Sequence, residues 1–380
     1  MAKDFCKKID TLHRVYPEPT LSADLRTNPE DFRVIEKLSF SPSGSGEHLF
    51  LQIEKTSANT DWIAKKLQKE FGLSSREIGY AGKKDRHSVA IQWFSLHLPG
   101  KEIALDKWAS NQEGVDLEGN DQKGENRERI SQLDKPEFKI LTTVRHNKKL
   151  RIGSLKENRF EIVLRNFTGK IDERLLDKIS KQGVPNYFGY QRFGFNANNL
   201  VNADDYLFQK IRIKNRNQRG MVISSARSLL FNLILSDRIK HQTWTKVLDG
   251  DCLMLDGSQS YFVVNKNASE EQSRVESADV HISGLLPGRQ VSDAQSKVKQ
   301  LEDEVLAQYP EWMNAFYRLN LTTGRRPFRC IPRELSIDYI DDQAVIKFNL
   351  NKGCYATSVL RELVNTTDLS LDHKNKDFQK

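Results

Sequence analysis

The first hundred residues alternate between patterns typical of strands and one pattern typical of a helix. Leu49, Leu51 and Ile53 recur at every second position within His48–Lys55, so this segment is predicted to form a strand, as is Phe32–Glu36. The stretch SPSGSGEH between them contains Gly and Pro and is expected to be a loop. It lacks a following GK[ST], so a plain loop is favoured over a phosphate-binding loop.

A helix is predicted next, with Thr60 as its N-cap. Ile63, Leu67 and Phe71 recur every four residues, and Gly72 is expected to end the helix. The apolar segment 88–98 then predicts a strand, which places AGKKDR in the connection between helix and strand. Connections held by a rigid scaffold often carry catalytic residues.

The composition changes at 110–138, which is polar, charged and poor in large apolar residues. We expect an extended surface loop or insertion, because such a segment buries too little apolar surface to offset its ordering entropy. Strands are predicted again at 140–144 and 159–164. The connection between these two strands, RHNKKLRIGSLKENRF, is basic. Two interpretations of it stand open: a solvated charged surface, or an edge that contacts phosphate groups.

The second half of the chain mixes helical and strand patterns without an internal repeat. A helix is predicted over 172–181, followed by a segment dense in Gly, Asn and aromatic residues, GVPNYFGYQRFGFNANN, which is typical of a domain junction. Further helices are predicted at 224–241 and 292–309, the latter stopped by Pro310. Strands are predicted at 252–255 and 261–264, and the chain closes with a strand at 344–350 and a helix at 357–364.

Charge and composition narrow the class of protein. Lys and Arg number 59 against 51 Asp and Glu, giving a net charge of +8, which favours a polyanionic partner. The four cysteines are far apart in sequence and form no CxxC or Cys/His cluster, so neither a zinc site nor a disulfide framework is indicated. No apolar run has the length of a signal peptide or of a membrane span, so a cytoplasmic protein without membrane contact is expected.

Two segments carry candidate chemistry. In AGKKDR, the carboxylate of Asp85 lies among Lys83, Lys84 and Arg86, whose positive charge favours its ionised form. On local chemistry alone, a catalytic carboxylate and an ordinary charged loop are equally supported. The second segment, 187–195, interleaves aromatic rings with Arg192. Such rings stack on unpaired bases, but for some of them a hydrophobic plug between domains is the favoured interpretation.

Over nearly its whole length the sequence resembles the TruD family of tRNA pseudouridine synthases. The matching stretches occur in the family's order: NPEDFRVIE, GSGEHLFLQIEK, AGKKDRHSVAIQW, LRIGSLKENRFEIVLR, GVPNYFGYQRFG, SSARSLLFN, LDGD and YATSVLRELVNTT. The polar insertion 110–138 is longer than expected for that family. It lies away from these motifs.

The resemblance implies a role for each of several residues. Asp85 occupies the position of the family's essential catalytic aspartate in its AGxKD motif. Asn158 and Phe160 match an Asn-x-Phe motif whose ring stacks on the target base and whose Asn helps to hold the catalytic loop. Arg26 stands where the family has a basic residue near the site. The remaining candidates for substrate binding are Lys84 and Arg192.

The resemblance also implies an α+β fold and a reaction. We expect a catalytic domain with a large mixed or antiparallel sheet flanked by helices, built from 1–183 plus 331–380, and an inserted α/β TRUD domain at 184–330. The expected reaction converts uridine to pseudouridine in tRNA, at position 13. Because pseudouridine is an isomer of uridine, no redox or group-carrying cofactor and no metal is expected. A monomer is expected, and a catalytically silent RNA-binding protein on the same scaffold is the alternative.

Overall fold

The computed structural model describes residues 2–100, 137–265 and 268–370, which form two compact units. The first unit comprises 1–21, 169–333 and 353–365, and the second comprises 22–168, 334–352 and 366–380, within those described ranges. Of the predicted insertion 110–138, residues 110–136 lie outside the described residues. No helix in the described ranges is long and apolar enough to cross a membrane.

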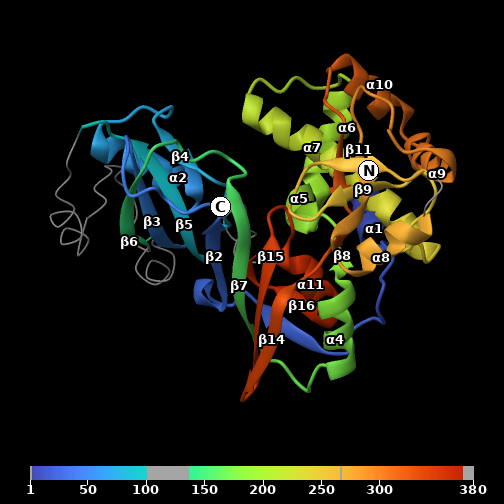
Figure 1. Ribbon diagram of the computed structural model, residues 1–380, viewed down its shortest axis with the longest axis horizontal. Coiled ribbons are helices and arrows are strands. Elements are labelled where there is room, and N and C mark those ends of the chain that lie inside the picture. The colour runs from blue at the N-terminus through green and yellow to red at the C-terminus, as the bar shows by residue number, and fades with distance from the viewer. Residues whose placement is uncertain (1, 101–136, 266–267, 371–380) are drawn as a thin grey trace, which may run out of the picture. The chain divides into compact units, whose positions relative to one another are not determined.

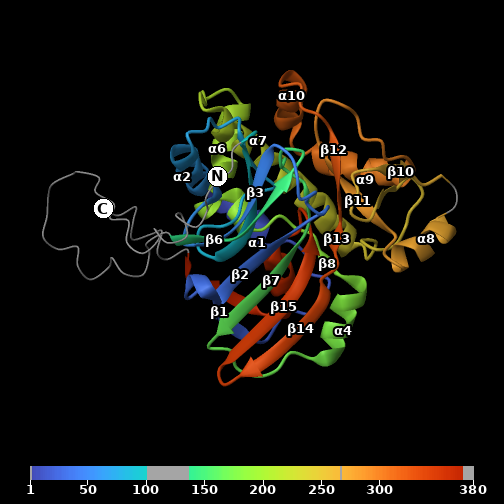
Figure 2. The same ribbon diagram turned by 60° about the vertical axis from the view of Figure 1, so that its left-hand side comes forward.

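The second unit is built on one large sheet (Figures 1 and 2). Its elements are β1 (Ser22–Leu25), η1 (Pro29–Asp31), β2 (Phe32–Leu38), β3 (His48–Thr56), α2 (Thr60–Phe71), β4 (Ile78–Tyr80), β5 (Val89–His97), β6 (Glu137–His146), β7 (Leu155–Arg165), β14 (Arg333–Ile340), β15 (Gln343–Asn351) and β16 (Asn365–Asp368). The strands follow the order β14-β15-β7-β2-β5-β3-β6, with β1, β4 and β16 joined to this path. The pair β2–β5 is parallel, whereas β2–β7, β7–β15, β3–β5 and β3–β6 are antiparallel, so the sheet is mixed.

Helix α2 covers part of one face of this sheet, as Figure 1 shows. Ile63 and Leu67 are fully buried against Leu51 and Ile53 of β3 and against Phe94 of β5. This is the packing that the four-residue recurrence of apolar residues predicts. Gly72 ends the helix in the left-handed conformation, with φ of 63°.

The predicted N-cap of α2 was wrong. Asn59 is the cap, and its side-chain oxygen accepts a 2.8 Å hydrogen bond from the Trp62 amide. Thr60 is instead the first residue of the helix, and its hydroxyl makes contacts outside the helix that bear on the candidate site. Both residue types are good caps, so the sequence alone did not separate them.

The first unit combines helices with two small sheets. Its elements are α1 (Ala2–Asp10), α4 (Glu173–Gln182), β8 (Val184–Pro185), α5 (Tyr190–Phe193), η3 (Phe195–Ala197), α6 (Asn198–Leu207), α7 (Arg216–Lys240), β9 (Cys252–Leu255), β10 (Tyr261–Val263), α8 (Ala268–Glu276), β11 (Val280–Leu286), α9 (Ser296–Leu306), α10 (Pro310–Arg318), β12 (Gly324–Pro327), β13 (Arg329–Cys330) and α11 (Ala356–Leu363). The sheets have the orders β10-β9-β11-β12 and β13-β8. The α+β class expected from the sequence is therefore confirmed.

The predicted helix 292–309 was wrong at both ends, because α9 spans Ser296–Leu306 and Pro310 begins the next helix, α10. A proline is compatible with the first turn of a helix, because the amide it lacks would have no partner within the helix.

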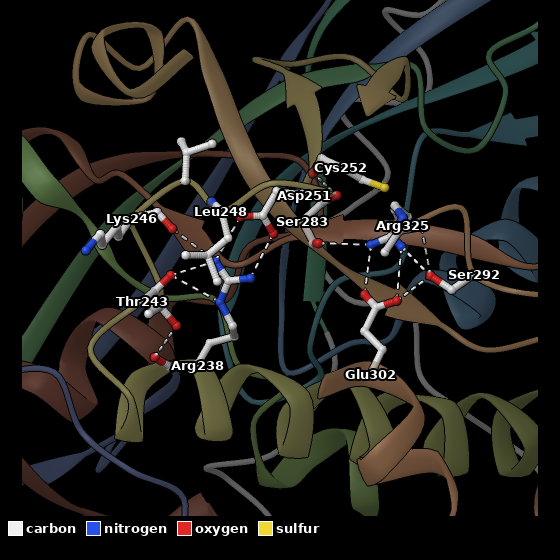
Figure 3. A network of polar contacts seen from close by, with 12 residues as sticks. Arg238, Thr243, Lys246, Leu248, Asp251, Cys252, Ser283, Ser292, Glu302 and Arg325 are labelled. Carbon is white, nitrogen blue, oxygen red and sulfur yellow. Dashed lines mark hydrogen bonds and ion pairs between the residues drawn. The ribbon is translucent and has the colours of Figure 1, made fainter. Parts of the chain in front are cut away.

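Two buried ion pairs lie in the interior of the first unit (Figure 3). Arg238 donates to both carboxylate oxygens of Asp251, at 2.8 and 3.0 Å, and Arg325 pairs with Glu302 at 2.9 Å. Asp251 also accepts from the Leu248 amide at 2.8 Å, so the LDGD motif has a structural function here.

Candidate active site

The register of the large sheet places several polar side chains on one face. Val34 of β2 lies opposite Phe160 of β7, and Glu36 lies opposite Asn158. Residues directly opposite one another point to the same face of a sheet, as do residues two apart on one strand. Glu36, Asn158 and Phe160 therefore share a face.

Lys55 lies on that face as well. Ala90 of β5 is opposite Val34 on one side and opposite Lys55 of β3 on the other. This is also the face that α2 covers over Leu51 and Ile53, so the polar residues lie where the helix no longer covers the strands.

The segment 81–88 connects β4 to β5 and is held by contacts from several elements. Its amide at Lys84 donates to the Thr60 hydroxyl at 3.0 Å, and its carbonyl at Ala81 accepts from the Gly153 amide at 2.7 Å. The carbonyl oxygen of Asp85 accepts from the Lys55 ammonium at 2.9 Å and from the Ser88 hydroxyl at 3.0 Å. The backbone of the connection is therefore fixed on the polar part of the sheet face.

The Asp85 side chain is 45% exposed and pairs with the guanidinium of Arg26. One guanidinium nitrogen of Arg26 lies 3.6 Å from a carboxylate oxygen of Asp85. Arg26 is itself only 2% exposed, and it pairs with Asp368 through two nitrogens, one of them at 3.1 Å. It directly follows β1, in the left-handed backbone region with φ of 57°, and its guanidinium lies over the Phe32 ring at 5.1 Å.

The lysines adjacent to Asp85 in sequence point to other carboxylates. The Lys83 ammonium lies 2.7 Å from Asp61, and the Lys84 ammonium lies 2.8 Å from Glu36. Lys84 also donates to the Asn158 side-chain oxygen at 2.9 Å. Proximity in sequence thus pointed to the wrong neighbours, because side chains of successive loop residues point in different directions.

Glu36 is fully buried, and its partner Lys84 is 7% exposed. Burial raises the pKa of Glu36, and the positive charge of Lys84 opposes that rise. Lys84 also donates to Asn158, so its side chain connects the segment 81–88 to both β2 and β7.

Phe160 lies at the centre of the sheet and is 7% exposed. Its ring contacts Phe32 edge-on, with centroids 6.1 Å apart, and Phe348 of β15 at 5.5 Å. Only a small part of the ring is therefore accessible, on the face that carries Asn158.

Arg192 belongs to the first unit, unlike the other predicted site residues. It lies in α5, donates to the hydroxyls of Ser224 and Ser228, the latter at 3.1 Å, and lies over the Phe188 ring at 5.4 Å. The aromatic segment around it divides: the rings at 187, 188 and 193 are buried in the core, whereas Tyr190 and Phe195 are about half exposed.

Sequence reasoning missed four residues that shape this site: Lys55, Glu36, Asp368 and Gln92, whose side chain donates to the Gly82 carbonyl of the loop. Lys55, Glu36 and Gln92 could have been found from the sequence, because each is a polar residue at a position where the alternation of the strand predicts a buried apolar one. Lys55, for example, follows Leu49, Leu51 and Ile53. Asp368 had no such sign, because it reaches Arg26 only through the pairing of β16 with β1.

Within the described ranges, no group of three or more His, Cys, Asp or Glu side chains is arranged to hold a metal ion.

Comparison with known proteins places the chain in a family. The family model for tRNA pseudouridine synthase D (TruD) matches residues 8–209 and 197–363. A protein named tRNA pseudouridine synthase D from Hydrogenovibrio crunogenus is 40% identical over 351 residues, covering 92% of this chain and 94% of the relative. A protein of the same name from Proteus mirabilis is 38% identical over 357 residues, with coverage of 93% and 95%.

A crystal structure from Methanosarcina mazei that carries the TruD name has the same fold. Its TM-score is 0.65 at 22% identity, and the match covers 94% of this chain and 98% of that chain. From the family model and the two sequence relatives together, the chain belongs to the tRNA pseudouridine synthase D (TruD) family.

Proposed function

We propose that this protein converts uridine to pseudouridine in tRNA and that Asp85 is its catalytic carboxylate. The names of the family and of its relatives support the reaction. The observation that carries the assignment of Asp85 is its placement: a half-exposed carboxylate on a fixed backbone, 3.6 Å from the buried guanidinium of Arg26. A nucleophile or base has to be accessible to substrate, whereas the groups that orient it benefit from burial.

The reaction requires one bond to break and another to form. The bond from N1 to C1′ breaks, the detached uracil turns, C5 bonds to C1′, and the proton that leaves C5 is balanced by one gained at N1. An ionised carboxylate at Asp85 serves either by attacking C1′ or by removing the 2′ proton. Both routes need the carboxylate charged, and the guanidinium of Arg26 lies 3.6 Å from it.

The remaining residues on the sheet face have roles that follow from their contacts. We propose that the accessible part of the Phe160 ring stacks on the target base, and that this contact replaces the stacking lost when the base leaves the RNA. Lys84 and Asn158 hold the loop through their mutual hydrogen bond and through Glu36. Arg192 is proposed to contact RNA from the first unit.

Cations next to the loop favour RNA as the partner. Lys148, Arg151, Lys156 and Lys352 are exposed, and none of them pairs with a carboxylate in the described part of the chain. The turn that contains Arg151 is connected to the Asp85 loop, because its Gly153 amide donates to Ala81. Exposed cations in and near a turn that is bonded to the Asp85 loop suit a phosphate backbone. We further propose that the enzyme modifies position 13, as a monomer, in the cytoplasm.

Incubation with unmodified tRNA transcript, without added metal or cofactor, tests the proposal. Pseudouridine mapping is expected to show product from wild type and none from Asp85→Asn, with tRNA binding retained. Asp338→Asn is the matched control, because Asp338 is an exposed carboxylate of the same unit that pairs with Lys347. Product from Asp85→Asn would refute the role of Asp85. A wild type that binds tRNA but forms no product would instead favour a silent RNA-binding protein.

A further inference from the structure

Lys55 is a buried cation that the proposed chemistry does not use directly. It lies at the penultimate position of β3, and 1% of its surface is exposed. Its ammonium donates to two backbone oxygens, those of Ala58 and Asp85, the latter at 2.9 Å. The first contact closes the turn after β3, and the second reaches the loop of the proposed catalytic residue.

A charge in this position is costly. Burial lowers the pKa of Lys55 to about 8; the negative charge of Asp85 opposes the fall, and the nearby positive charge of Lys84 adds to it. An apolar side chain would continue the series Leu49, Leu51 and Ile53 at no such cost. The contacts of the ammonium indicate the function of this charge: it connects β3 to the carbonyl of Asp85 in the loop.

We propose that Lys55 is a positioning residue for the reaction, whose ammonium fixes the backbone of Asp85 and so aims the carboxylate at the ribose. The proposal rests on the proposed function, in which Asp85 is the catalytic group. Two cations then act on Asp85 from different sides of the residue: Lys55 holds its backbone oxygen, and Arg26 lies beside its carboxylate. The Ser88 hydroxyl also donates to the Asp85 carbonyl, but Ser88 is itself part of the loop, whereas Lys55 holds the loop from β3.

The test compares Lys55→Met with Lys37→Met. Lys37 lies on β2 in the same sheet, is 43% exposed and pairs with Glu157 at 2.9 Å, outside the proposed machinery. For Lys55→Met we expect kcat to fall by about 10- to 100-fold while KM for tRNA changes by less than about threefold, because a small misplacement of a reacting group costs rate rather than binding. Lys37→Met is expected to keep wild-type kcat.

Hydrogen exchange separates positioning from other roles. Amides of 81–88 are expected to exchange faster in Lys55→Met than in wild type, while those of β7 are unchanged. A kcat within about twofold of wild type would overturn the proposal, and so would a loss of kcat without faster exchange in the loop. A wild type that forms no pseudouridine would overturn the proposed function. Exchange needs no turnover, so the amides of 81–88 would still decide whether Lys55 holds the loop.

The charge-retaining variant Lys55→Arg gives an independent measurement should Lys55→Met fail to fold. We expect kcat of wild type to decline above about pH 8, as Lys55 loses its charge. Because guanidinium does not titrate in the accessible range, we expect Lys55→Arg to lack this decline. The same alkaline decline in both proteins would contradict the proposal.

Discussion

At the scale of single residues, the charge beside Asp85 depends on a contact that spans almost the whole chain. Arg26 is held by Asp368, which follows it by 342 positions, and is backed by the Phe32 ring. A buried guanidinium that pairs with one carboxylate and faces a second one is oriented before substrate arrives. Arg26 therefore supplies both charge and orientation, which a mobile surface lysine would not.

Arg26→Met removes this charge. We expect kcat to fall by about 10- to 100-fold, the equivalent of one lost charged contact of about 1.5–3 kcal/mol. Arg26→Lys should recover only part of the rate, because an ammonium cannot keep both contacts to Asp368 and the approach to Asp85. Rates under saturating tRNA give the comparison, and full activity in Arg26→Met would exclude a role for this charge.

Phe160 and Phe348 form a matched pair for testing base stacking. Both rings are buried and pack on each other at 5.5 Å. Replacing either by Leu is expected to cost about 1 kcal/mol of unfolding free energy. Only Phe160→Leu should also lower kcat strongly with little change in tRNA affinity. Equal kcat in the two variants would show that the Phe160 ring is structural.

The buried charge of Lys55 links stability to pH. Its pKa is lowered from 10.5 to about 8, so between these values the unfolded chain binds more protons than the folded one. The contribution of Lys55 to unfolding free energy therefore rises as pH increases from about 8 to 10.5, by about 3 kcal/mol at most. Urea unfolding at pH 7 and pH 10 should show this rise in wild type relative to Lys55→Met; parallel pH profiles would contradict it.

At the scale of elements, the start of α2 performs two separate functions. Asn59 caps the helix, whereas the Thr60 hydroxyl accepts from Lys84 of the loop and donates to Gln92 of β5 at 3.0 Å. Gln92 in turn donates to the Gly82 carbonyl. Helix, strand and loop thus meet at one hydroxyl, which makes the helix N-terminus part of the support for Asp85.

This division predicts opposite effects of two neighbouring substitutions. Asn59→Ala should cost about 1 kcal/mol of stability and leave kcat near wild type, because only the cap is lost. Thr60→Ala should keep the cap but lower kcat, because the Lys84 amide loses its partner. Thermal unfolding and kcat measured on both proteins check this prediction. A larger kcat loss in Asn59→Ala than in Thr60→Ala would reverse the assignment.

At the scale of the whole molecule, the sequence predicted local elements better than their partners. The strands β2, β3, β5, β9, β10 and β15 and helices α2, α4 and α11 lie within one or two residues of their predicted bounds, because their burial is periodic. The short β4, the exposed β14 and helices α1, α6 and α10 were missed. Buried residues do recur at helical spacing in these helices, such as Phe5 and Ile9 in α1, but each helix is only nine or ten residues long. Pairings such as Phe348 with Phe160 were not predictable, because periodicity shows which face is buried but not against which distant strand.

The candidate site likewise was predictable in its motif residues but not in the contacts between them. The motifs identified Asp85, Asn158 and Phe160 as candidates. They did not show that Lys84 pairs with Glu36 or that Lys55 donates to the loop. These contacts depend on register across four strands. The predicted division of the chain into a catalytic and an inserted domain, and the roles of the site residues, stay predictions.

The buried ion pairs of the first unit allow the two units to be tested apart. Asp251→Asn leaves Arg238 buried without its carboxylate (Figure 3), and such a loss costs about 3–5 kcal/mol. Asp338→Asn in the second unit breaks an exposed pair with Lys347 and should cost less than about 1 kcal/mol.

Hydrogen exchange is the suitable measurement, because it reports on each element separately. For Asp251→Asn we expect faster exchange in α7 and β9, with β2, β3 and β7 unchanged. Equal acceleration in both sets would show that the two units open together, and the loop of Asp85 would then depend on the interior of the first unit as well as on Lys55 and Thr60.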